Sequence, residues 1–191
     1  MTASERMKTI TVFGGSSYSE DSDVYAAAYS LGRALAREGF VLCNGGYGGT
    51  MAAAAKGASE SGGRTVGITL SDSPNRWIQR NDPQPDHWRR MQTLLARGDG
   101  YVVLPGGTGT LAELGVLLES INKGIITRSP IVLLKNYWTP LMDLLGEERI
   151  LRSDGGFSAA GEVEMRGAVA LTDVPGAAVN FLAANLPASG G

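Results

Sequence analysis

The sequence predicts an α/β fold: a single parallel, doubly wound sheet of about six or seven strands, with helices on both faces. Short apolar segments alternate along the chain with longer segments of helical periodicity. The apolar segments are continuous, as in strands that are buried on both faces of a parallel sheet. Glycine-rich turns follow three of these segments. Together these features indicate one Rossmann-like nucleotide-binding domain over residues 1–191, with residues 1–7 and 187–191 frayed.

Strands are expected where a short apolar or β-branched run is bounded by glycine, proline or polar residues. These runs span residues 9–13, 40–43, 64–70, 101–104, 130–134 and 168–171. The run at 101–104 stops at Pro105, which cannot continue a ladder of strand hydrogen bonds.

Helices are expected over residues 21–38, 51–61, 87–97, 110–123, 138–150 and 175–186. Asp21 or Ser22 is a candidate N-cap for the first, and Gly39 is suited to end it. The alanines of the second suit close packing against a sheet, and the next three carry apolar residues at helical spacing. Residues 151–166 are rich in glycine and charge and receive no assignment.

Residues 71–86 interrupt the alternation of strands and helices. The segment is polar, contains three prolines, and is expected to form a long loop over the mouth of a pocket. Arg76, Trp77 and Arg80 are candidates to contact a base or a phosphate there. An ordinary surface loop, or a contact between subunits, is an equally good interpretation of this segment.

Composition excludes several classes of function. The net charge is −2 without a basic stripe, so a nucleic-acid footprint is not expected. Cys43 is the only cysteine and His87 the only histidine, so no zinc-type cluster and no internal disulfide are expected. The first residues lack the apolar core of a signal peptide, and no apolar run has the ~20 residues that span a bilayer. A cytoplasmic protein is expected.

The three glycine turns would open on one edge, because the carboxyl ends of parallel strands meet there. Each turn alone is also compatible with a simple strand-to-helix connection. Three at one edge favour a nucleotide pocket in which backbone N–H groups and a helix N-terminus hold a phosphate. The candidate phosphate- and nucleotide-binding residues are Gly14, Ser16, Gly45, Gly46, Gly49, Thr50, Gly106, Gly107, Thr108, Gly109 and Thr110.

Glu113 lies close to the third turn, in what is expected to be the first turn of a helix. Thr110 and Glu113 also have the spacing of a capping box, in which Glu113 would cap its own helix. The turn itself is not a Walker A loop, because no Gly-Lys-Ser/Thr follows. It also lacks the glycine spacing and the downstream acid of a nicotinamide dinucleotide site.

The segment Pro105-Gly-Gly-Thr-Gly-Thr-Leu-Ala-Glu113 resembles the P-G-G-x-G-T-x-x-E signature of the LOG ("Lonely Guy") family. The likeness extends over about residues 9–182. This family is often mislabelled "lysine decarboxylase", and its characterised members are cytokinin riboside 5′-monophosphate phosphoribohydrolases. The resemblance implies hydrolysis of an AMP-like nucleoside 5′-monophosphate to free base and ribose 5-phosphate, with no metal or redox cofactor. It also implies a homodimer or a larger assembly of dimers.

The resemblance also implies the catalytic pair Glu113 and Arg90. Arg90 is preferred over Arg89 because its spacing to Glu113 matches that of the family's catalytic arginine and glutamate. Without that spacing, a lone helical arginine would be interpreted as a surface charge. We expect Arg90 to keep Glu113 ionised, since an opposite charge nearby favours the charged form.

The chain departs from the family pattern before its central strand and in its second glycine turn. Where the family has M-H-x-R-K-x-x-M, this chain has Arg90-Met91 with Leu94, and the family's lysine is absent. The second turn has Tyr47 in place of the usual third glycine. These departures indicate a divergent branch in which base specificity does not carry over.

Two other functions are alternatives to this hydrolase. One is a non-catalytic nucleotide or molybdenum-cofactor carrier of the same superfamily, and the other is a nucleotide sensor that acts through a protein partner. Lysine decarboxylation is rejected because Lys56, Lys123 and Lys135 have no recognisable pyridoxal-phosphate context.

Overall fold

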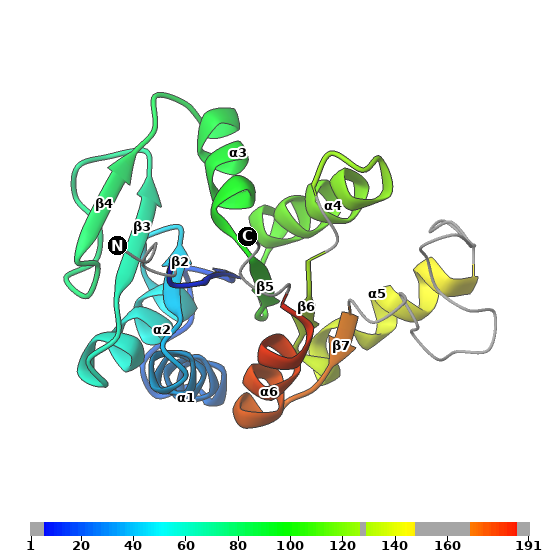
Figure 1. The fold of residues 1–191 in the computed structure, drawn as a ribbon, viewed down its shortest axis with the longest axis horizontal. Helices are drawn as coiled ribbons and strands as arrows, with labels where there is room; N and C mark the ends of the chain where they lie inside the picture. The colour runs from blue at the N-terminus through cyan, green and yellow to red at the C-terminus, as the bar shows by residue number, and fades with distance from the viewer. Residues whose placement is uncertain (1–5, 127–128, 148–168, 187–191) are drawn as a thin grey trace, which may run out of the picture.

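The computed structural model describes residues 6–126, 129–147 and 169–186, and Figure 1 shows its elements. In chain order, these elements are β1 (Thr9–Phe13), α1 (Asp23–Arg37), β2 (Val41–Asn44), α2 (Gly49–Glu60), β3 (Thr65–Thr69), β4 (Arg80–Pro83), α3 (His87–Arg97), β5 (Gly100–Val103), α4 (Thr108–Asn122), β6 (Ile131–Leu133), α5 (Lys135–Glu147), β7 (Val169–Leu171) and α6 (Pro175–Asn185). Within these residues, no helix is long and apolar enough to cross a membrane.

The strands form one seven-stranded sheet in the order β4-β3-β2-β1-β5-β6-β7, and every pairing is parallel. The predicted fold class is therefore confirmed. The chain first builds outward from β1 through β4, then returns through α3 to place β5 on the other side of β1. The boundary between β1 and β5 is the topological switch point, where ligands bind in sheets of this kind.

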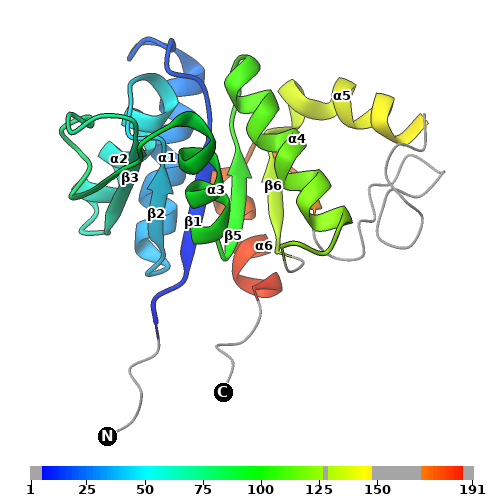
Figure 2. The ribbon, with the colours of Figure 1, turned by 90° about the horizontal axis from the view of Figure 1, so that it is seen from above.

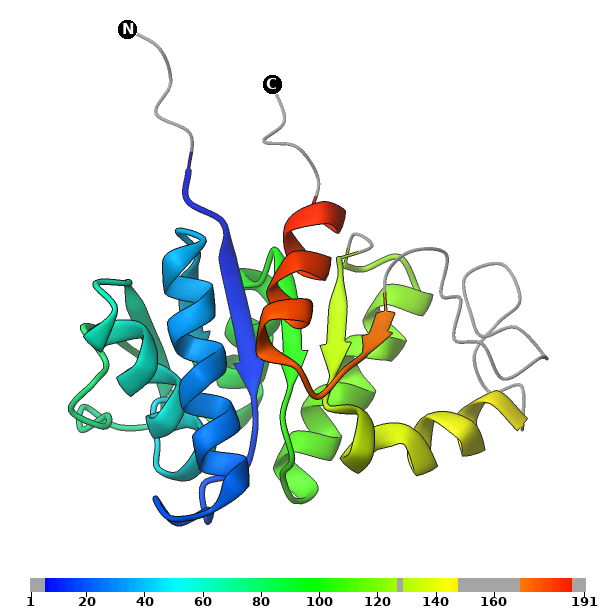
Figure 3. The same cartoon turned by 90° about the horizontal axis from the view of Figure 1, so that it is seen from below.

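Two apolar clusters cover the two faces of the sheet. Ile10 and Val12 pack with buried residues of α1, α2 and α6 on one face, and Figure 3 shows α1 and α6 side by side there. Phe13, Tyr101 and Val103 pack with α3, α4 and α5 on the other face, where Figure 2 shows α3 and α4. Successive side chains of a strand point to opposite faces of the sheet, so each strand contributes residues to both clusters.

Local signals placed several helix ends correctly. The Ser22 side chain accepts a hydrogen bond from the Tyr25 N–H at the start of α1, and Gly39 has a φ of 77° just beyond its end. The third helix begins and ends as predicted, with Asp86 as an N-cap that accepts from the Arg89 N–H. α2, α4 and α5 each begin two or three residues earlier than expected.

The loop prediction for residues 71–86 was wrong in part, because β4 lies inside it. β4 pairs only with β3 and forms an edge of the sheet. Its residues are exposed or half-buried, and Pro83 ends it. An edge strand needs no continuous apolar run, which explains why the apolar pattern did not reveal it. The unassigned segment 151–166 and the predicted helix end at 148–150 lie outside the described residues.

Candidate functional site

A pocket of about 630 Å³ opens at the switch point, at the carboxyl ends of β1, β2 and β5. In Figure 3, the turns after β1 and β5 lie at the same end of the sheet. The lining residues come from the turns after β1, β2 and β5 and from four helices: Gly14, Gly15, Ser16, Ser17, Tyr18, Tyr47, Met51, Arg90, Gly106, Gly107, Thr108, Gly109, Thr110, Glu113 and Tyr137. The location agrees with the prediction that the glycine turns share one edge.

The turn after β5 forms one wall of this pocket and leads directly into α4. Gly107 is the N-cap of α4 and provides no side-chain cap, so a side chain does not occupy the N–H groups of the first helical turn. The turn is held from two sides. The Pro105 carbonyl accepts from the Gly15 N–H at 3.0 Å, and the Gly106 carbonyl accepts from the Tyr137 hydroxyl at 2.6 Å. The result is a fixed, uncapped helix N-terminus, which favours an anion.

The turn after β2 contributes Tyr47 to the pocket, but not its glycines. Gly45, Gly46, Gly49 and Thr50 do not line the pocket, whereas Gly14 and Ser16 of the first turn do. Thr50 instead donates twice to the Gly15 carbonyl, from its N–H at 3.0 Å and from its hydroxyl at 3.1 Å. Thr50 therefore supports the wall of the pocket from behind, and Gly49 packs against the same Gly15 carbonyl.

Arg90 reaches the pocket from α3 and is only 8% exposed. Its Nε donates to the Ile68 carbonyl at 2.8 Å, and its Nη2 lies 3.5 Å from the Gly45 carbonyl oxygen. Its guanidinium carbon lies 5.2 Å from the centre of the Tyr47 ring, within range of a cation–π contact. These contacts fix the guanidinium and leave Nη1 directed at Glu113.

Glu113 lies on α4 with its side chain 12% exposed, and its Oε1 is 3.9 Å from Arg90 Nη1. The structure brings the predicted pair together in one cavity. Because α4 begins at Thr108, Glu113 lies beyond the first turn and cannot cap the helix. The capping-box alternative is therefore wrong.

Burial raises the pKa of Glu113 to about 7, and the nearby Arg90 charge lowers it by less than burial raises it. Our expectation that Arg90 holds Glu113 fully ionised is corrected accordingly. At neutral pH the carboxyl exchanges between its protonated and ionised forms, a property typical of catalytic acids and bases.

Sequence reasoning missed the pocket's aromatic side chains. Tyr18 and Tyr137 both line the pocket, and Tyr137 reaches it from the first turn of α5. Tyr47 accepts from the Leu70 N–H at 2.8 Å while its ring covers Arg90. Only Tyr47 carried a sequence signal, since it stands inside a glycine turn.

The residues proposed for the long loop lie elsewhere. Arg76 stacks on Trp77, with its guanidinium carbon 4.5 Å from the ring centre, and Lys56 lies 5.7 Å from the same ring. Neither Arg76 nor Trp77 lines the pocket at the switch point. Arg80 is the first residue of β4 and lines a different pocket.

Comparisons with known proteins identify the family of this chain. The model of the SLOG cluster4 family matches residues 7–143. The chain is 28% identical over 146 residues to the cytokinin riboside 5′-monophosphate phosphoribohydrolase of Rhodococcoides fascians, a match that covers 72% of this chain and 74% of that protein. It is 34% identical over 99 residues to the enzyme of the same name from Mycobacterium tuberculosis, covering 49% of this chain and 53% of that protein.

Among solved structures, the molybdenum cofactor binding protein of Rippkaea orientalis has a similar fold. Its TM-score is 0.71 at 24% identity, and the alignment covers 95% of this chain and 98% of that one. At this identity the likeness supports the fold alone.

Proposed function

The chain belongs to the SLOG cluster4 family, and from this premise we propose that it is a phosphoribohydrolase. Its reaction is hydrolysis of the N-glycosidic bond of a nucleoside 5′-monophosphate, which yields free base and ribose 5-phosphate. Residues 1–191 act as a single Rossmann-like nucleotide-binding domain. The relatives named as phosphoribohydrolases support the general reaction, and a cytokinin-like base is the finer part of the proposal.

The observation that carries the proposal is a buried carboxyl, Glu113, held 3.9 Å from a buried guanidinium, Arg90, in a cavity bounded by an uncapped helix N-terminus. A binding protein for a phosphorylated ligand needs the helix N-terminus. It does not need a buried acid whose pKa is raised to about 7. Burying such an acid costs folding free energy, so its presence favours a chemical role.

The 5′-phosphate would lie on the turn from Gly106 to Thr108 and on the first turn of α4. Backbone N–H groups and the Thr108 hydroxyl are the donors available there, and Ser16 faces the same pocket from the turn after β1. Thr110 also lines the pocket, but it is only 3% exposed and packs against Gly106, so it mainly shapes the turn. The helix dipole adds attraction for a charged phosphate.

With the phosphate held there, the ribose would extend along α4 toward Glu113. Breaking the N-glycosidic bond develops positive charge on the ribose, as in glycoside hydrolysis generally. The ionised Glu113 carboxylate stabilises that charge and can take a proton from the attacking water. One preorganised contact of this kind lowers a barrier by on the order of 3 kcal/mol, about a hundredfold in rate.

Arg90 sets the position and the charge of Glu113. Its contacts with the Ile68 and Gly45 carbonyls use Nε and Nη2 and leave Nη1 to pair with Glu113. The pair is therefore oriented before substrate arrives, and no reorganisation is needed during the reaction.

The test measures free base released by the purified protein from AMP and from N6-isopentenyl-AMP. Glu113→Gln is expected to lower kcat at least about a hundredfold, while calorimetry gives an unchanged nucleotide affinity. Glu119→Gln, the same change at an exposed position of α4, is the matched control and is expected to keep full activity.

Release of base that persists unchanged in Glu113→Gln contradicts the proposed role. If wild-type protein releases no base from either nucleotide but binds a nucleotide or a pterin phosphate, the carrier alternative replaces the enzyme. The homodimer that the family resemblance implies is checked by the mass in analytical ultracentrifugation.

A further inference from the structure

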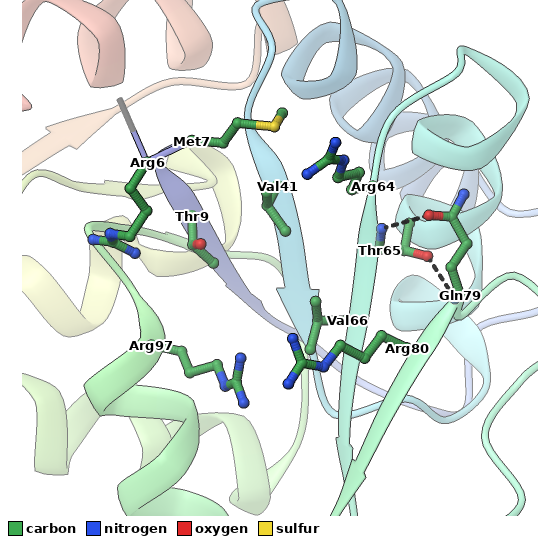
Figure 4. A pocket seen from close by; sticks show the side chains of 10 residues that line it. All are labelled: Arg6, Met7, Thr9, Val41, Arg64, Thr65, Val66, Gln79, Arg80 and Arg97. Atoms are coloured by element: carbon green, nitrogen blue, oxygen red, sulfur yellow. Dashed lines mark hydrogen bonds between the residues drawn. The ribbon is translucent and has the colours of Figure 1, made fainter. Parts of the chain in front are cut away.

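A second pocket lies at the amino ends of the strands, and we call it the amino-edge pocket. Its volume is about 650 Å³. It is lined by Arg6, Met7, Thr9, Val41, Arg64, Thr65, Val66, Gln79, Arg80 and Arg97, all drawn in Figure 4. Because Thr9, Val41 and Thr65 begin β1, β2 and β3, this pocket and the switch-point pocket lie at opposite ends of the same strands. Of the residues that the structure describes, none lines both pockets.

Four arginines from separate segments meet in the amino-edge pocket. Arg6 precedes β1, Arg64 precedes β3, Arg80 begins β4, and Arg97 ends α3. In Figure 4 the guanidinium groups of Arg80 and Arg97 point toward one another from their two elements, and the Arg64 guanidinium lies farther along the same side, toward Val41 and Met7. Positive side chains gathered in this way repel one another unless an anion lies between them.

Acidic side chains neutralise only part of this charge. Arg6 pairs with Asp99 at 2.6 Å, and Arg97 pairs with Asp82. Among the described residues, Arg64 and Arg80 form no ion pair, and no Asp or Glu lines the pocket. Two guanidinium groups therefore remain uncompensated in one hollow, within a chain whose net charge is −2.

We propose that the amino-edge pocket is a second ligand site, which binds an organic phosphate carrying at least two negative charges. Guanidinium groups bind phosphate oxygens through paired N–H donors and also stack on planar rings. Met7, Val41 and Val66 supply apolar surface for the organic part of the ligand. The volume lies within the range of small-molecule sites, roughly 300–1,000 Å³.

The arrangement favours a small molecule over a nucleic-acid strand. A strand is bound by a positive groove that follows its backbone, commonly with aromatic side chains on which bases stack. None of the described residues that line the amino-edge pocket is aromatic, and its four arginines line one hollow.

The site has a direct structural connection to the switch-point pocket. α3 carries Arg97 at its last position and Arg90 seven residues earlier, which is about 10 Å along a helix axis. β3 begins at Thr65 in the amino-edge pocket, and its Ile68 carbonyl anchors Arg90. The two pockets are thus separate sites joined by the same two rigid elements.

The experiment is an NMR titration of the ¹⁵N-labelled chain with ADP. Backbone signals of Val41, Thr65 and Val66 report the amino-edge pocket, and those of Gly106, Gly107 and Gly109 report the switch-point pocket. We expect saturable shifts in the first group. The double variant Arg64→Ala/Arg80→Ala is expected to weaken ADP binding in that group by roughly tenfold or more, since two charged hydrogen-bond donors are lost. The second group should titrate as in wild type.

Arg76→Ala/Arg89→Ala is the matched control, because it removes the same charge from exposed positions outside both pockets. In this variant, both groups of signals should titrate with ADP as they do in wild type. Three results would each overturn the proposal: no saturable shift in the amino-edge signals, equal binding by the two double variants, or an oligothymidylate that saturates these signals at a lower concentration than ADP. Each leaves the phosphoribohydrolase proposal standing, since that is measured by base release.

Discussion

The glycine turns after β2 and β5 look alike in sequence but differ in what they do. Both follow a buried strand and lead into a helix whose N-cap is glycine without a side-chain cap. The turn after β5 lines the switch-point pocket, whereas Gly45, Gly46 and Gly49 of the turn after β2 are buried behind it. Among the described residues, no atom lies near the Cβ positions of Gly107 and Gly109 after β5, although Gly106 packs against Thr110. In the turn after β2, a Cβ at Gly45, Gly46 or Gly49 would collide with other atoms of the protein.

Gly49 gives the largest expected effect, and it concerns stability. Its φ is 59°, and a Cβ there would collide with the Gly15 carbonyl oxygen, which is backbone and cannot rotate away. Gly49→Ala should lower the free energy of unfolding by about 3 kcal/mol or more, measured by urea denaturation. Gly62→Ala is the control, since Gly62 has a φ of 77° and open space around its Cβ position. Its cost should be only about 1 kcal/mol. Equal losses would show that the turn after β2 is not tightly packed.

Arg90 joins the two turns, because it contacts the Gly45 carbonyl and pairs with Glu113 on the helix after the β5 turn. Arg90→Gln should lower kcat/KM for AMP about a hundredfold. Combined with Glu113→Gln, the loss should fall far short of the product of the two single losses, because the residues act as a unit. The exposed neighbour Arg89→Gln should keep wild-type kinetics. Multiplicative losses would mean that Arg90 acts independently of Glu113.

The buried Glu113 predicts a dependence of stability on pH. Its ordinary pKa of 4.5 rises to about 7 in the fold, mainly through burial. Between these values the folded chain holds a proton that the unfolded chain has released, so stability falls as pH rises through this window. Glu113→Gln removes this loss. It should be more stable than wild type by about 2–3 kcal/mol at pH 8, with the difference vanishing near pH 4.

Chemical denaturation of both proteins at several pH values measures this difference. Glu119→Gln should parallel wild type, since Glu119 is exposed on the same helix. A Glu113→Gln variant that is equally stable relative to wild type at pH 4 and pH 8 would contradict a raised pKa.

The smallest stability effect is expected at Gly109, which lies in the first turn of α4 and faces the pocket. No atom lies within 4 Å of its Cβ position. Gly109→Ala should therefore raise stability by up to about 1 kcal/mol, because alanine favours the helix. The added methyl group would occupy ligand space and should raise the KM for AMP. Gly115→Ala, open in the same way but outside the pocket, should stabilise without changing KM. If both variants keep wild-type KM, the turn after β5 is not the phosphate site.

The sequence could indicate the sheet and its edge because both depend on local features. Continuous apolar strands and the glycine turns after them are visible along the chain, and parallel pairing then brings the turns together. β4 was not predicted, because an edge strand buries too little side-chain surface to need an apolar pattern. The pair Arg90 and Glu113 was found only through the resemblance to the LOG family, since spacing in sequence gives no distance between two helices.

By itself, the sequence determined the fold class, the switch-point edge and the glycine turn that begins α4. Only the tertiary structure decided which glycines line the pocket, because strands and helices distant in sequence fill the space beside each turn. It also decided that burial outweighs Arg90 in setting the pKa of Glu113. Desolvation depends on every atom packed around a group, and that packing exists only after the chain has folded.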